Sequence, residues 1–199
     1  MSLEKIVGIL SYLSPVFIWW KPVLVLSIIL SLGYHFFFRR EVVDARVIRR
    51  LAYGSLIISF CFVIYWTTLQ IMIYKLPGSF MAKAIDSKYT ASLFLFNLGE
   101  YFIWSFISAT VFSLVLYKLY KRNSQIISIY EIWFYFVLAF LMGWDRGIVL
   151  IVIALFMMVI THIFYKIKGK AIERLSVYPY LLISSLPIFI YNIYFLVPA

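Results

Sequence analysis

The chain has 199 residues, of which 65% are hydrophobic, 21% aromatic and only 13% charged. Soluble domains carry about 25% charged residues, so the composition excludes an ordinary soluble enzyme and predicts an all-α, polytopic transmembrane helix bundle that forms one integral membrane domain over residues 1–199. The formal net charge of +10 does not indicate nucleic-acid binding, because the basic residues flank apolar runs, where they set topology and contact lipid headgroups.

Seven apolar runs predict seven membrane spans joined by short loops. In chain order these spans cover residues 6–20, 22–38, 51–74, 91–117, 125–144, 147–165 and 177–197. The first span is short for a crossing of ~20 residues. It meets the second at Pro22, where we expect a tight hairpin anchored by aromatic side chains. Gly143 to Gly147 predicts another tight turn, between the fifth and sixth spans.

An arginine cluster separates the second predicted span from the third. Residues 39–50 contain five arginines, and a short loop so rich in arginine stays on the cytosolic side of a membrane. With the amino terminus also cytosolic and the carboxyl terminus outside, 13 of the 18 Lys and Arg residues lie inside. We therefore expect a multi-pass protein of the cell membrane, with a basic cytosolic face that contacts anionic lipid headgroups.

Glu100 is the first residue that could carry chemistry, because it lies inside the fourth predicted span. A charged side chain near the middle of a bilayer costs about 2.5 kcal/mol or more, so such residues are neutral, paired or exposed to a wet cavity. Asn97 and Trp104 lie one helical turn to either side, on the same predicted face. Glu100 and Asn97 are therefore candidates for proton or cation transfer, and a hydrogen bond between spans explains Glu100 equally well.

Asp44 and Glu131 form a second candidate pair, since both are predicted at the cytosolic ends of spans. Two carboxyl groups brought together can share a proton, so that one acts as a base and the other as an acid. Taken singly, each residue also has a structural explanation. Asp44 would pair with Arg40 or Arg46, and Glu131 would be a favourable acid near the amino terminus of a helix.

The order of the elements over residues 22–197 resembles the type IV prepilin peptidases, which are polytopic membrane aspartic proteases. The segment from Asp44 to Leu51 resembles the first aspartate segment of that family, and Tyr178-Pro179-Tyr180 resembles its proline-aromatic motif. Ser128-Ile129-Tyr130-Glu131 stands in the place of the Gly-x-Gly-Asp motif, without either glycine and with Glu in place of Asp. The resemblance implies that Asp44 and Glu131 are the catalytic carboxylates, in an active or an altered peptidase.

His35 and His162 are the only histidines, and Cys61 is the only cysteine. The two histidines are predicted at similar depth near the cytosolic side, where a pair could ligate a haem or a metal. Neither belongs to a ligand-spacing motif, and a histidine at the membrane interface explains each one. We expect no cofactor and no internal disulfide.

Three classes of function remain. The first is a non-catalytic subunit of a larger membrane assembly of the secretion, pilus or respiratory type, whose partners are the lipid bilayer and other membrane subunits. The second is a prepilin-peptidase-like protease that uses Asp44 and Glu131 on the cytosolic face. The third is a proton-coupled transporter or channel that uses Glu100. We favour the first, because no catalytic motif in the sequence is intact.

Overall fold

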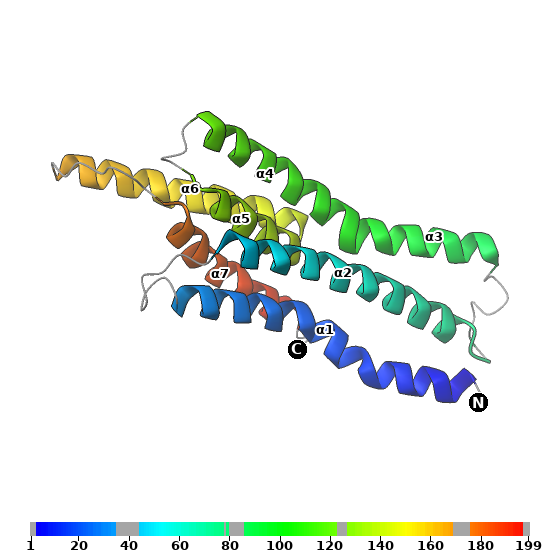
Figure 1. Ribbon diagram of the computed structural model, residues 1–199. Coiled ribbons are helices and arrows are strands. Elements are labelled where there is room, and N and C mark those ends of the chain that lie inside the picture. The colour runs from blue at the N-terminus through cyan, green and yellow to red at the C-terminus, as the bar shows by residue number, and fades with distance from the viewer. Residues whose placement is uncertain are drawn as a thin grey trace.

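The computed structural model describes residues 3–34, 44–77, 79, 86–122, 127–168 and 176–196. Within these residues it is an all-α bundle of elongated helices, as the composition predicts (Figure 1). The elements in chain order are α1 (Leu3–Tyr34), α2 (Ala45–Tyr74), α3 (Ser87–Leu98), the π-helical turn η2 (Gly99–Ile103), α4 (Trp104–Arg122), α5 (Ile129–Met142), α6 (Trp144–Ile167) and α7 (Tyr178–Leu196).

The expected hairpin at Pro22 is wrong, because the first two predicted spans form one continuous helix, α1. Two antiparallel helices need a connection of about 2–5 residues, whereas only Lys21 lies between the two predicted spans. No glycine or asparagine is present there to reverse the chain. Pro22 is instead buried, and α1 packs against α2, α5 and α7. A proline within a helix is tolerated where neighbouring helices hold the chain in place.

The fourth predicted span lies within a longer helical rod. Helices α3 and α4 are joined without a break by η2, giving 36 helical residues from Ser87 to Arg122. This rod, α2 and α6 are the three helices of the described residues that are long and apolar enough to cross a membrane. These three helices are compatible with a membrane protein. Each of them contains one of the predicted spans, the third, the fourth or the sixth.

Helix α5 occupies the centre of the bundle. It contacts α1, α2, α4, α6 and α7, and every residue from Phe134 to Met142 is buried. A helix that is apolar all round is expected in a protein interior. With 14 residues it measures about 21 Å, which is shorter than the ~30 Å hydrocarbon core of a bilayer. The fifth predicted span is thus a buried core helix.

The turn between α5 and α6 is tight, as the sequence predicts. Gly143 adopts a φ of 101°, a left-handed conformation that favours glycine. Four residues later, Gly147 packs so closely on α5 that a Cβ atom added to it would lie 2.9 Å from Cβ of Ala139. The hydroxyl group of Tyr135 donates a hydrogen bond of 3.2 Å to the Gly147 carbonyl. These contacts lock α6 against the central helix.

Basic residues gather at one end of the bundle, which we call the arginine end. It contains the first turns of α2, α5 and α7 and the last turns of α1, α4 and α6, and the amino terminus of α1 lies at the opposite end (Figure 1). Among the described residues, its basic side chains are Arg46, Arg49, Arg50, Lys118, Lys121, Arg122, Lys166 and Lys168. The opposite end has Lys5, Lys75 and Lys88.

Candidate functional site

Glu131 is a buried clamp between two helices at the arginine end. Its side chain is only 1% exposed. One carboxylate oxygen, Oε2, accepts hydrogen bonds of 2.6 Å from the backbone N–H and the hydroxyl group of Ser128, which completes a capping box at the start of α5. The other oxygen, Oε1, accepts from the Ser176 hydroxyl group and, at 3.1 Å, from the backbone N–H of Tyr178 at the start of α7. The carboxylate therefore joins two positive helix ends.

Asp44 has a different environment. It is exposed and caps α2, with its Oδ1 atom accepting a hydrogen bond of 2.9 Å from the backbone N–H of Arg46. Its helix and that of Glu131 begin at the same end of the bundle (Figure 1). Each carboxylate, however, serves as a helix cap, so the catalytic pairing of Asp44 with Glu131 stays a prediction.

Asn97 also has a structural role, since it links α3 to α2. Its side-chain amide donates hydrogen bonds of 3.0 Å to Thr67 Oγ1 and 2.7 Å to Gln70 Oε1. Asn97 is buried, whereas Glu100 and Trp104 are exposed. The three residues therefore do not share one environment, because the π-helical turn η2 that contains Glu100 changes the spacing of side chains along the rod.

Glu100 lies in the wall of a cavity of about 510 Å³, which we call the charged cavity. Several elements meet there: α1, α2, η2, the start of α4, the α5–α6 turn and α7. The lining residues with polar or aromatic side chains are Trp20, Lys21, Phe62, Trp66, Glu100, Tyr101, Ser105, Trp144, Asp145, Arg146 and Phe189. Two cations and two carboxylates are thus brought to one cavity by three separate elements, α1, η2 and α6, which makes it the candidate functional site.

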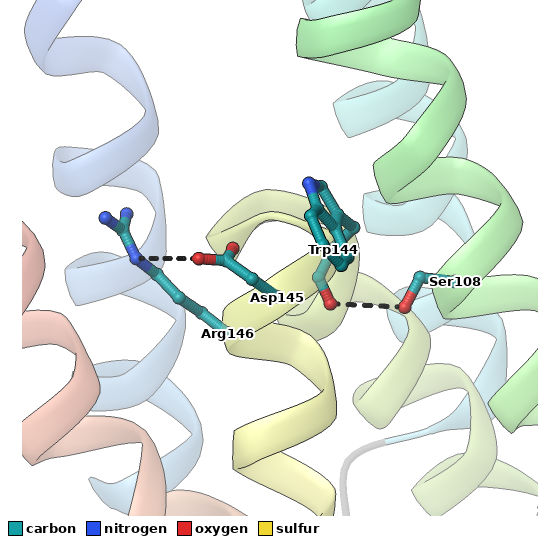
Figure 2. A network of polar contacts seen from close by, with 4 residues as sticks. All are labelled: Ser108, Trp144, Asp145 and Arg146. Carbon is teal, nitrogen blue, oxygen red and sulfur yellow. Dashed lines mark hydrogen bonds and ion pairs between the residues drawn. The ribbon is translucent and has the colours of Figure 1, made fainter.

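The start of α6 supplies one charged pair to the charged cavity. Arg146 Nε lies 3.9 Å from Asp145 Oδ2, so these neighbouring residues form a local ion pair (Figure 2). The contact is loose, and the two side chains are 34% and 59% exposed. The Ser108 hydroxyl group on α4 donates a hydrogen bond of 3.3 Å to the Trp144 carbonyl, which holds this turn of α6 in place (Figure 2).

The α1 side of the charged cavity presents hydrogen-bond donors. The Lys21 ammonium lies 5.7 Å from the centre of the Trp20 ring and has no ion pair with a carboxylate among the described residues. The indole nitrogens of Trp20 and Trp66 are buried, and neither has a hydrogen-bond partner in the part of the chain that the structure describes. A buried donor without a partner costs about 1–3 kcal/mol. Lys21 is therefore a cation on this side of the cavity without a carboxylate partner among the described residues.

Sequence reasoning identified Glu100 and missed the rest of the charged cavity. The expected hairpin at Pro22 places Lys21 between two spans, outside both of them. A usable signal was present, since charged residues directly follow tryptophans in Trp19-Trp20-Lys21 and in Trp144-Asp145-Arg146. Such pairings are typical of membrane interfaces. That the two segments meet could not be read from their positions, which are more than a hundred residues apart.

The histidines give no support for a metal or haem site. His162 is exposed on α6, and His35 lies outside the described residues. Among the residues that the structure describes, no group of three or more His, Cys, Asp or Glu side chains is arranged to hold a metal ion.

No protein-family model matches the chain, and no curated protein and no solved structure is significantly similar to it. The function is therefore inferred from the side chains themselves.

Proposed function

We propose that the chain is a multi-pass integral membrane protein that serves as a non-catalytic subunit of a larger assembly in the cell membrane. The observation that carries this proposal is the Glu131 clamp. A catalytic carboxylate must reach its substrate and keep a position free for the reacting proton or water. Glu131 is 1% exposed, and each of its two carboxylate oxygens accepts two hydrogen bonds. It is therefore suited to joining helices.

The distribution of basic residues supports an orientation with the arginine end in the cytosol. Helix α1 is one continuous helix of 32 residues, and its two ends lie at opposite ends of the bundle (Figure 1). If the loop after α1 is cytosolic, the amino terminus is outside, contrary to the sequence-based topology. The carboxyl end of α7 points away from the cytosol in both topologies.

The long helices present apolar surfaces that suit partner spans as well as lipid. Ile57 on α2, Leu114 on α4 and Phe156 on α6 are each more than half exposed. Polar side chains are few on these surfaces, and no loop of the chain is long enough to form a soluble domain. Contacts with other subunits would therefore be made within the membrane, by packing of helix against helix.

Site-specific photo-crosslinking in the native membrane tests the proposal. A photoreactive phenylalanine analogue is introduced at Ile57, Leu114 or Phe156, and at Val63, which is 0% exposed, as the control. We expect at least one of the three exposed positions to give a discrete adduct of fixed mass, and Val63 to give none. Only the 23.5 kDa chain or its multiples at all three exposed positions would contradict a role as a subunit of a mixed assembly.

A further inference from the structure

We propose that the charged cavity binds a zwitterionic headgroup that combines a phosphate with a primary ammonium group, as in phosphatidylethanolamine. The phosphate would lie on the α1 side, against Lys21 and beside the rings of Trp20 and Trp66. The ammonium group would lie on the opposite side, between Glu100 and Asp145. This inference is independent of which subunits surround the protein.

The dimensions of α6 give the depth of the charged cavity in a bilayer. Lys166 and Lys168 lie at the end of α6, and the cavity residues Trp144 to Arg146 lie at its beginning. The 24 residues of α6 extend over about 36 Å, slightly more than a ~30 Å hydrocarbon core. With Lys166 and Lys168 at one layer of headgroups, α6 is long enough to bring the charged cavity to the other layer.

The aromatic residues of the charged cavity fit the same depth. Trp20, Trp66, Tyr101 and Trp144 come from four different elements and line one cavity. Tryptophan and tyrosine are enriched at the level of the headgroups, where one part of the ring is apolar and the other is polar. A lipid headgroup is thus the ligand with the most direct access to this position.

The donors of the charged cavity specify an anionic group. The Lys21 ammonium and the indole N–H groups of Trp20 and Trp66 lack acceptors among the described residues. The Lys21 ammonium suits the oxygens of a phosphate, which accept strong, charge-assisted hydrogen bonds. Arg146 is only loosely paired with Asp145 and adds a second cation.

The acceptors of the charged cavity specify a cation beside that anion. Glu100 makes no hydrogen bond or ion pair to any residue within the described ranges, and Asp145 is 59% exposed. The formal charges of Lys21, Arg146, Glu100 and Asp145 cancel. A site without net charge favours a zwitterion over an anionic lipid, because binding of an anion alone leaves two carboxylates facing a negative ligand. The volume of about 510 Å³ lies within the range of ligand pockets, about 300–1,000 Å³.

Native mass spectrometry of the full chain tests the proposal. The protein is purified in mild detergent with equal amounts of phosphatidylethanolamine, phosphatidylglycerol and phosphatidylcholine, and the retained lipid adducts are counted. We expect phosphatidylethanolamine to be retained preferentially. Lys21→Gln and Glu100→Gln should each weaken its binding about tenfold, as loss of a charge-assisted hydrogen bond implies. Equal retention of the three lipids by the unsubstituted chain would overturn the proposal.

Matched controls separate the charged cavity from general charge effects. Lys88→Gln and Glu4→Gln remove the same charges from exposed positions outside the cavity and should leave binding unchanged. Trp66→Phe keeps an aromatic side chain and changes no charge, but replaces the indole by a smaller phenyl ring without an N–H donor, so it tests the site even if Lys21→Gln impairs folding. Displacement of the lipid by glycerophosphoethanolamine would assign the site to a soluble form of the same headgroup. Binding that survives Lys21→Gln, Glu100→Gln and Trp66→Phe alike would refute the assignment.

Discussion

The Glu131 carboxylate joins the start of α5 to the start of α7 through four hydrogen bonds. All four groups that contact its carboxylate are donors, which matches the acceptor-only form of the side chain. In Glu131→Gln, the amide NH₂ group would face donors that it cannot satisfy. We expect a loss of about 2 kcal/mol in the free energy of unfolding, because a buried N–H or O–H group loses its acceptor. Unfolding in detergent, followed by circular dichroism during titration with SDS, measures the loss.

Asp86→Asn is the matched control for that substitution. Asp86 is an exposed cap of α3 whose Oδ1 atom accepts a single hydrogen bond of 2.7 Å from the Tyr89 backbone N–H. Asparagine caps helices about as well as aspartate, so stability should change little. If Glu131→Gln were as stable as the unsubstituted chain and lost a peptidase activity, the clamp would be wrong and the catalytic interpretation would gain support.

The sequence predicts part of the environment of Glu131. Its position in the first turns of a helix is visible in the pattern Ser128-x-x-Glu131, which is a capping box. The second half of the clamp comes from Ser176 and Tyr178, on a segment more than forty residues away. No local pattern marks that contact, because tertiary packing alone brings the start of α7 to the start of α5. The resemblance to the peptidase family includes both Glu131 and Tyr178, but it does not identify the contact between them.

At the scale of elements, helix α6 packs closely on the central helix α5 at Gly147. A methyl group at Gly147 would lie 2.9 Å from Cβ and 3.1 Å from Cα of Ala139. The Cα atom belongs to the backbone of a buried helix and cannot move without shifting α5. We therefore expect Gly147→Ala to reduce the free energy of unfolding by about 1–3 kcal/mol through overpacking. The same SDS titration measures the effect.

Gly54→Ala is the control for this steric argument. Gly54 lies within α2, and a methyl group added there has no heavy atom within 4 Å. Alanine is favoured over glycine in a helix by up to about 1 kcal/mol, so this variant should be at least as stable as the unsubstituted chain. A stable Gly147→Ala variant beside an unchanged Gly54→Ala variant would show that α5 and α6 do not pack at this distance.

The apolar pattern predicts where helices form better than where they end. Helices α2, α6 and α7 cover the third, sixth and seventh predicted spans, because charged or turn residues limit these runs on both sides. The first two predicted spans lack such a limit, because the single residue between them, Lys21, is too short a connection for a turn. Helix α5 is shorter than the fifth predicted span and lies in the interior of the bundle. An apolar run alone does not distinguish burial in protein from burial in lipid.

For the whole molecule, the continuity of α1 and the position of the basic residues together predict a topology. The arginine end contains most of the basic side chains of the described residues, and Lys5 and Lys88 lie at the opposite end. An arginine end in the cytosol thus requires Lys5 and Lys88 to be on the outer side together. A hairpin at Pro22 would instead leave Lys5 in the cytosol and only Lys88 outside.

Labelling of single cysteines with a membrane-impermeant maleimide in intact cells distinguishes these topologies. Cys61, the only native cysteine, is replaced by serine to give an unlabelled parent. We expect Lys5→Cys and Lys88→Cys to react in intact cells, and Lys168→Cys at the arginine end to react only after lysis. Protection of Lys5→Cys with labelling of Lys88→Cys would show that α1 does not cross the membrane as one helix. The charged cavity would then lose its place at the outer headgroups, because the depth of Lys21 depends on that crossing.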